Sequence, residues 1–422
     1  MPRFKLQVKT ILARRRVPMV FLGLVLLLGL GVYLFLNTNV TRVTDILDGQ
    51  ECRNSHSDLN DRLACWHNII AKSMETDGIP SAINTFATLY RWFPEFADAG
   101  CHFQAHQVGD LAYYSYFVAE GMALSEIDFP DSTASCGNGF FHGFLEHLIQ
   151  SKPTAEAIYS ECEDLIAKQE GVNPRIRIAC YHASGHGLAR AELDRRYNEP
   201  ITDVQAFVAR PLAECARIAE TKFIERQNCS QGVLNVVVNW MSLEKYGLSI
   251  SREKPFGICD ELFHGTTYYD QCLVEISRKI DGLSDQDPKK IVQLLNPLSI
   301  SNELRTELLM TAIAGVIQQI VRGGDPIVVL KKCEALSKDD FLVCQNGIVR
   351  GLILNGSPRS EIESVAAFCR SEMVARAGDE LQCWQTAGNT LGQFYAEEKY
   401  KYLCRSLGHD ECQYFQTEHV RN

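Results

Sequence analysis

Length, charge and cysteine content already limit what this protein can be. The chain has 422 residues, with 42 Lys and Arg against 52 Asp and Glu, which gives a net charge of −10. Without the six basic residues before residue 17, the remainder carries a net charge of −16. So acidic a chain has little electrostatic attraction for phosphate backbones, which argues against a nucleic acid or an anionic lipid surface as its partner.

The first forty residues predict a membrane anchor. Residues 17–36 are 20 residues without a charged side chain, and as a helix they would span the roughly 30 Å core of a bilayer. Residues 1–16 contain six basic side chains and no acidic one, so we expect them in the cytoplasm. The polar stretch Asn-Thr-Asn follows Leu36 where a cleavable signal would have small residues, which favours an uncleaved signal anchor.

The cysteines predict a disulfide-bonded domain in an oxidising compartment. All 16 lie on the exported side of the predicted anchor, and their number is even. This distribution is typical of a periplasmic domain in a bacterium, or of a lumenal or extracellular domain in a eukaryote. Seven pairs of neighbours close short loops, and the remaining two cysteines pair by exclusion. The eight predicted disulfides are Cys52–Cys65, Cys101–Cys136, Cys162–Cys180, Cys215–Cys229, Cys259–Cys272, Cys333–Cys344, Cys369–Cys383 and Cys404–Cys412.

The same cysteines mark out a helical repeat. The first of each pair usually lies in an acidic, helix-like segment, and the second opens a segment with apolar residues every three to four positions. Successive second cysteines from Cys136 to Cys272 are 44, 49 and 43 residues apart, the length of a two-helix repeat. We therefore predict an all-α fold, a solenoid-like array of disulfide-stapled α/α hairpins behind one transmembrane helix. The hairpins should cover residues 37–290 and continue through residues 291–422.

Glycines recur inside the expected second helices, where each costs about 1 kcal/mol relative to alanine. Close approach between neighbouring helices is the simplest feature that would offset this cost.

Several enzyme classes lack their usual motifs in this sequence. It has no P-loop, no G-x-S-x-G, no H-E-x-x-H, and no C-x-x-C or C-x-x-C-H. Covalent haem attachment and thiol–disulfide exchange at a vicinal cysteine pair are therefore disfavoured.

Histidines carry the one pattern that suggests chemistry. Seven of the 11 fall between His102 and His264. Two pairs are spaced four apart, so each pair projects from one face of a helix, and a third expected helix carries two histidines and a glutamate. The candidate metal ligands are His102, His106, His142, His147, His182 and His186, with Glu146 as a candidate catalytic base and Asp110 as a supporting carboxylate.

The register of the repeat predicts that these histidines converge. His142 and His186 both lie six residues after their helix's cysteine, and His106 lies five after its own. Equivalent positions of stacked hairpins point in the same direction, so we expect the three to share a site that suits Zn, Fe or Cu. The alternative for any single histidine is a packed side chain bonded to a backbone carbonyl. The nearby Tyr and Phe side chains are expected to be core.

Three functions fit these observations. The first is a membrane-anchored binding or scaffold protein with an envelope or lumenal protein partner and a His-lined metal site. The second is a metal-dependent enzyme, either oxidative or hydrolytic, in which Glu146 would serve as the base for a metal-bound water. The third is non-covalent binding of haem by two histidines.

Overall fold

The computed structural model describes residues 44–396, apart from residues 99, 170, 172, 220, 321–323 and 357–360, together with residues 402 and 405. Contacts divide the chain into two compact units, residues 1–65 and 66–422. Among the described residues every regular element is helical, which confirms the all-α fold. The predicted span at residues 17–36 lies outside the described part. None of the described helices has the length and apolar character to cross a bilayer.

In the first unit, residues 44–55 are helical and carry Cys52, which is bonded to Cys65. The chain continues through α2 (Leu59–Trp92), which bends at Gly78, where φ is +79°. The helices that follow up to the first stapled hairpin are α3 (Pro94–Ala97), α4 (Cys101–Ala112), η1 (Tyr113–Ala119), η2 (Leu124–Glu126), η3 (Asp131–Ala134) and α5 (Ser135–Ser151).

The remaining helices of the second unit form hairpins. Three of them come in succession: α6 (Ala155–Gln169) with α7 (Ile176–Arg195), α8 (Val204–Arg217) with α9 (Phe223–Ser242), and α10 (Gly257–Phe263) with α11 (Tyr269–Ser277). The next, α12 (Pro288–Leu295) with α13 (Asn302–Ile320), contains no cysteine. The last are α14 (Pro326–Cys333) with α15 (Lys338–Asn355), and α16 (Glu361–Cys369), α17 (Glu372–Ala377) and α18 (Glu380–Leu391). The domain boundary expected at residues 290 and 291 falls inside α12.

Seven of the eight predicted disulfides lie among the described residues, and all seven are present. Their Cα–Cα distances run from 5.3 to 6.5 Å. Five join the two arms of a hairpin in the second unit, Cys52–Cys65 joins the helix of residues 44–55 to α2, and Cys101–Cys136 joins the starts of α4 and α5. The predicted pair Cys404–Cys412 lies outside the described residues. So many disulfides indicate an oxidising, extracytoplasmic environment.

Local sequence sets where several hairpin helices begin. The side chain of Asp203 accepts a hydrogen bond from the Ala206 backbone N–H and caps α8. Asp287 and Asp325 cap α12 and α14 in the same way, and each is followed by proline at the first helical position. These residues satisfy backbone donors that a helix start leaves open, and proline there has no N–H to lose.

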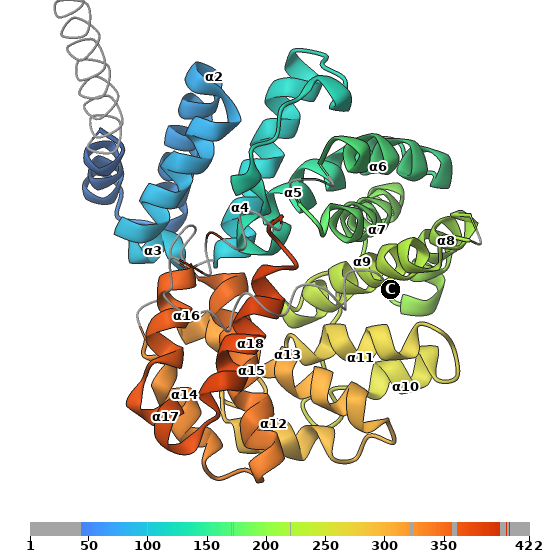
Figure 1. The fold of residues 1–422 in the computed structure, drawn as a ribbon. Coiled ribbons are helices and arrows are strands. Elements are labelled where there is room, and N and C mark those ends of the chain that lie inside the picture. Colours follow the sequence, from blue (N-terminus) through green and yellow to red (C-terminus); the bar gives the residue numbers. More distant parts are fainter. Residues whose placement is uncertain are drawn as a thin grey trace, which may run out of the picture. The chain divides into compact units, whose positions relative to one another are not determined.

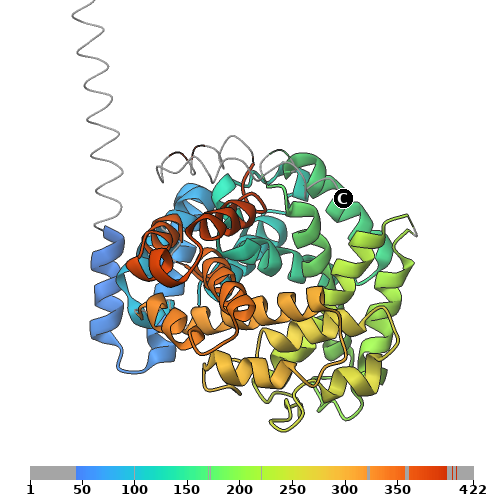
Figure 2. The same ribbon diagram turned by 60° about the horizontal axis from the view of Figure 1, so that its bottom comes forward.

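The second helices of successive hairpins pack side by side. Helix α5 lies between α4 and α7, and α7 lies between α5 and α9 (Figure 1). The order continues through α11 and α13 to α15, which returns to contact α4 and α5. Within the second unit the later helices therefore lie beside the earlier ones, as a second view also shows (Figure 2).

Glycines bring these helices into backbone contact. A Cβ on Gly232 of α9 would overlap the carbonyl oxygen of His182 on α7. In α5, a Cβ on Gly139 would overlap the carbonyl oxygen of His102 on α4, and one on Gly143 would overlap that of His106. The helices can approach this closely only where no side chain intervenes, which explains the glycines. The same contacts hold histidine-bearing turns of neighbouring helices together.

The aromatic residues around α5 are mostly core, as expected from their spacing. Phe140, Phe141 and Phe144 are fully buried, and all three rings lie against Phe129 at centroid distances of 5.4 to 5.9 Å. Through these contacts the ring of Phe129 packs against α5. Helix α5 is thus held from one side by this cluster and from the others by α4 and α7.

Candidate metal centre

Three adjacent helices supply the histidines. Helix α4 carries His102 and His106, α5 carries His142, Glu146 and His147, and α7 carries His182 and His186. On α4 and α7 the two histidines are four residues apart, so they lie one turn above each other on the face towards α5. The arrangement groups these side chains into two overlapping sets that could each hold a metal ion, one of three histidines and one of two histidines and a glutamate.

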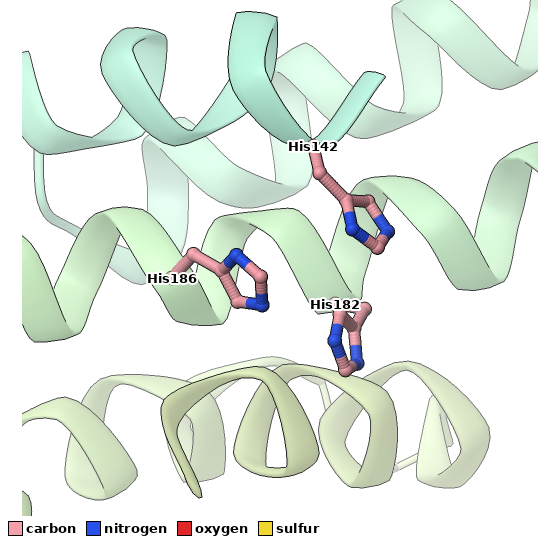
Figure 3. A group of neighbouring side chains, drawn as sticks. All are labelled: His142, His182 and His186. Carbon is pink, nitrogen blue, oxygen red and sulfur yellow. The ribbon is translucent and has the colours of Figure 1, made fainter. Parts of the chain in front are cut away.

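The first set is His142, His182 and His186. One ligand atom from each lies within 4.8 Å of the others. The ring centroids are 5.1 Å apart for His142 and His182, 5.3 Å for His142 and His186, and 4.9 Å for His182 and His186. The three residues are 8%, 9% and 5% exposed, and their rings turn towards one another (Figure 3). Burial, followed by the charges of neighbouring groups, holds the pKa of His142 and His182 well below the ordinary value, so both are neutral at pH 7.

A chain of hydrogen bonds fixes the orientation of His142. Nδ1 of His102 lies 2.9 Å from the carbonyl oxygen of Cys136 and must be the donor, since a carbonyl only accepts. Burial lowers the pKa of His102 to about 3, so its Nε2 carries no proton and accepts from Nδ1 of His142 at 3.1 Å. In neutral His142 the proton is then on Nδ1, and Nε2 keeps a free lone pair.

Glu146 fixes the orientation of His186. Oε2 of Glu146 lies 3.3 Å from Nδ1 of His186 and 3.2 Å from Nε2 of His106, and Oε1 pairs with Arg190. Burial alone would raise the pKa of Glu146. Hydrogen bonds from the two histidines and the charge of Arg190 outweigh burial and hold it well below its usual range. When His186 is neutral and donates from Nδ1, its Nε2 has a lone pair, and that atom is buried with no hydrogen-bond partner among the described residues.

The second set, His106, Glu146 and His186, is a charge-paired cluster. One ligand atom from each lies within 4.8 Å of the others. His106 also lies 3.4 Å from Asp110 through Nδ1, so a carboxylate faces each of its nitrogens. Burial opposes a charge on this ring. The hydrogen bonds and charges of Asp110 and Glu146 outweigh burial and raise the pKa of His106 to about 9. At pH 7 this ring is an imidazolium, and both of its nitrogens carry protons.

The predicted metal ligands have different roles in the structure, although their sequence spacing is alike. His102 is a hydrogen-bond partner of His142 and lies outside both sets. His147 belongs to neither set, and lies 3.4 Å from Asp110 and stacked on Tyr113 at 5.4 Å. Arg190 belongs to no sequence motif, although its position four residues after His186 places it on the same helical face.

No protein-family model matches this chain, and no curated protein is significantly similar to it.

Proposed function

We propose that this protein binds one transition-metal ion, with zinc as the first candidate, through Nε2 of His142, His182 and His186. The observation that carries the proposal is Nε2 of His186, a buried acceptor without a hydrogen-bond partner among the described residues. A buried polar atom without a partner costs about 1–3 kcal/mol, so a native structure that keeps one needs a reason. A metal ion between the three rings satisfies this atom.

The surroundings of the three rings support a metal site. Metal-bound histidines usually donate their second N–H to a carboxylate or a carbonyl, which fixes the tautomer and the ring orientation. His186 donates to Glu146, and His142 is fixed by His102, which in turn donates to the carbonyl of Cys136. Zn–N bonds of 2.0–2.1 Å place tetrahedral ligand atoms about 3.3 Å apart. The ligand atoms lie within 4.8 Å of one another, so the longest separation would shorten by about 1.5 Å at most.

Three imidazoles suit a metal ion with one open coordination position, which is the pattern of catalytic zinc sites. Haem takes two histidines on opposite faces, whereas here three rings converge on one point. Glu146 is already bonded to His106, His186 and Arg190, and its lowered pKa makes it a weak general base at neutral pH. In this proposal it therefore positions His186 and takes no proton from water.

The wider architecture is part of the same proposal. Residues 17–36 would anchor the chain, residues 1–16 would remain in the cytoplasm, and the metal site would lie in the periplasm. The hairpins would be copies of one two-helix unit. Gly139, Gly232 and Gly347 support this, because each follows its helix's cysteine by three residues and each would overlap the preceding second helix if it carried a Cβ.

The test is the metal content of the purified full-length chain. We expect one zinc, or another first-row metal, per chain, and its loss in His142→Ala and His186→Ala with helical content retained. His264→Ala is the matched control, since His264 is exposed and belongs to neither set. Unchanged stoichiometry in both site variants would exclude the three-histidine site. Absence of any bound metal after incubation with zinc would exclude the function.

A further inference from the structure

The charge of the loaded site is not balanced by its own ligands. Three neutral imidazoles leave the two positive charges of a divalent metal in place, in a site whose ligands are all buried. The nearest carboxylate, Glu146, is already paired with Arg190 and with the positive ring of His106. Concentrating charge in a buried environment is costly unless an opposite charge accompanies it.

Three arginines from distant parts of the second unit gather beside the histidines. Arg175 precedes α7, Arg278 caps the end of α11, and Arg350 lies on α15. Burial first, then the charges of Arg350 and Arg278, lower the pKa of Arg175 to about 10. The helical register places them on the same side as the histidines. Arg278 and Arg350 follow Cys272 and Cys344 by six residues, as His142 and His186 follow their own cysteines, and α15 contacts α4 and α5. Arg175 precedes His182 by seven residues, two turns of helix, so both lie on one face of α7.

Two of these guanidinium groups have donors to spare. Arg350 already forms an ion pair, because its Nη1 lies 2.6 Å from Oε1 of Glu307. Arg278 touches Glu275 only through Nε, at 3.4 Å, and its side chain is 38% exposed. The oxygens of Glu275 already accept hydrogen bonds from Gln231 and Asn235.

Arg175 is held by an aromatic ring and has no acidic partner in the described part of the chain. Its guanidinium lies over the ring of Phe394, 5.5 Å from the centroid. No carboxylate among the described residues lies within ion-pair distance of it. A guanidinium presents five N–H donors in a planar fork that matches a carboxylate or a phosphate.

The neighbouring groups leave this region positive. The cations are Arg175, Arg278, Lys279 and Arg350, and the carboxylates that interact with them are Glu275, Asp281 and Glu307. Burial raises the pKa of Asp281, which weakens its contribution further. A positive region is notable in a domain whose overall charge is strongly negative.

We propose that Arg175 and Arg278 bind an anionic ligand, a carboxylate or a phosphate, next to the three histidines. This proposal rests on the proposed metal function, because the same anion would fill the open coordination position of the metal ion. The two guanidinium groups would orient the anion, and the metal ion would attract it by its charge. The ligand that this site takes is therefore a small organic acid or a phosphate ester rather than a neutral molecule.

The experiment uses the full-length chain loaded with cobalt(II), whose visible absorption changes when an anion enters its coordination shell. Acetate and inorganic phosphate are titrated separately, which distinguishes the two classes of anion. We expect Arg175→Gln and Arg278→Gln each to weaken binding of the preferred anion by about 10-fold to 100-fold, since hydrogen bonds to charged groups are worth about 1.5–3 kcal/mol. Cobalt stoichiometry should stay unchanged.

The controls separate the anion site from the fold and from the metal. Arg217→Gln removes an exposed arginine that pairs with Glu156 and Glu214 on outer helices, and should leave anion affinity unchanged. Arg278→Lys keeps the charge and loses the fork, so it should give an intermediate loss even if the glutamine variant misfolds.

Equal anion affinity in wild type and both arginine variants, or no anion binding to the loaded chain, would overturn the proposal. If the chain binds no cobalt, the metal function fails by itself. Calorimetric titration of the metal-free chain with phosphate then decides the anion site. Binding that depends on Arg278 supports the site, and absence of binding overturns it.

Discussion

The contact between Gly232 and His182 can be tested by adding a single methyl group. In Gly232→Ala the new Cβ would overlap the His182 carbonyl oxygen, which belongs to the backbone of α7 and cannot rotate away. The contact is reciprocal, because a Cβ on Gly185 of α7 would in turn overlap the carbonyl oxygen of Cys229 on α9. We therefore expect α7 and α9 to be forced apart at this point.

Two opposing terms set the size of the effect. Alanine in a helix interior gains about 1 kcal/mol over glycine. Overpacking of a close-packed interface typically costs about 1–3 kcal/mol, and a backbone clash should fall at the upper end. The net expectation is a loss of about 2 kcal/mol in the free energy of unfolding. His182 would shift with α7, so metal affinity should fall as well.

Gly257→Ala is the matched control for this variant. Gly257 is the first residue of α10, and a Cβ there would meet only Lys254, at 3.4 Å, an ordinary contact. This variant should be as stable as wild type or slightly more stable. Urea unfolding followed by circular dichroism measures both variants. If Gly232→Ala unfolds at the same urea concentration as Gly257→Ala, backbone contact does not explain the glycines.

Two further predictions concern the histidines. The lowered pKa values of His102, His142 and His182 mean that these rings take up protons on unfolding once the pH falls below the ordinary value of 6.5. The metal-free chain should therefore be fully stabilised by these groups above pH 6.5, and should lose about 1 kcal/mol for each ring between pH 6.5 and about pH 5.5. Equal urea midpoints at the two pH values would contradict these protonation states. Glu146→Gln keeps an acceptor but loses the charge, and should weaken metal binding by about 10-fold to 100-fold in competition with a chelator. Glu163→Gln should not, and equal affinity in the two variants would show that the carboxylate does not orient its imidazole.

The fold was predictable because its strongest signals are local. Cysteines 11 to 18 residues apart in the sequence can pair only if the chain between them turns back, which defines a hairpin without any knowledge of the rest. Cys101 and Cys136 are 35 residues apart and were paired only by exclusion. Their disulfide joins the neighbouring helices α4 and α5, whereas each hairpin disulfide joins the two arms of a single hairpin.

The roles within the histidine cluster were not predictable, because they depend on backbone detail. Cys136, Gly137 and Asn138 all adopt positive φ values of 57° to 63°, which turns the Cys136 carbonyl towards His102. Nothing in the sequence marks a non-glycine residue such as Cys136 for this conformation. The spacing of His102 from His106 matches that of His182 from His186. Yet the pair on α7 contributes both of its rings to the three-histidine set, and the pair on α4 contributes neither.

Arg175 and Arg278 were missed for a different reason. They are separated by about a quarter of the chain, and neither belongs to a motif. Only the return of α15 to α4 and α5 brings the later helices beside the histidines. Sequence spacing can place residues on one helix or on neighbouring hairpins, but it carries no information on where an array of hairpins meets itself.

The disulfide between Cys101 and Cys136 also bears on the order in which the protein is oxidised and its histidine cluster takes its final geometry. Its second cysteine supplies the carbonyl that sets the proton of His102, and through it the tautomer of His142. A newly made chain with reduced thiols lacks the covalent tie that holds this carbonyl in place. If the site binds a metal as proposed, oxidation would come before metal capture, and the chain would acquire its metal in the oxidising compartment where it folds. The thiol chemistry of that compartment would thereby protect the site from being filled with whichever metal is most abundant in the cytoplasm.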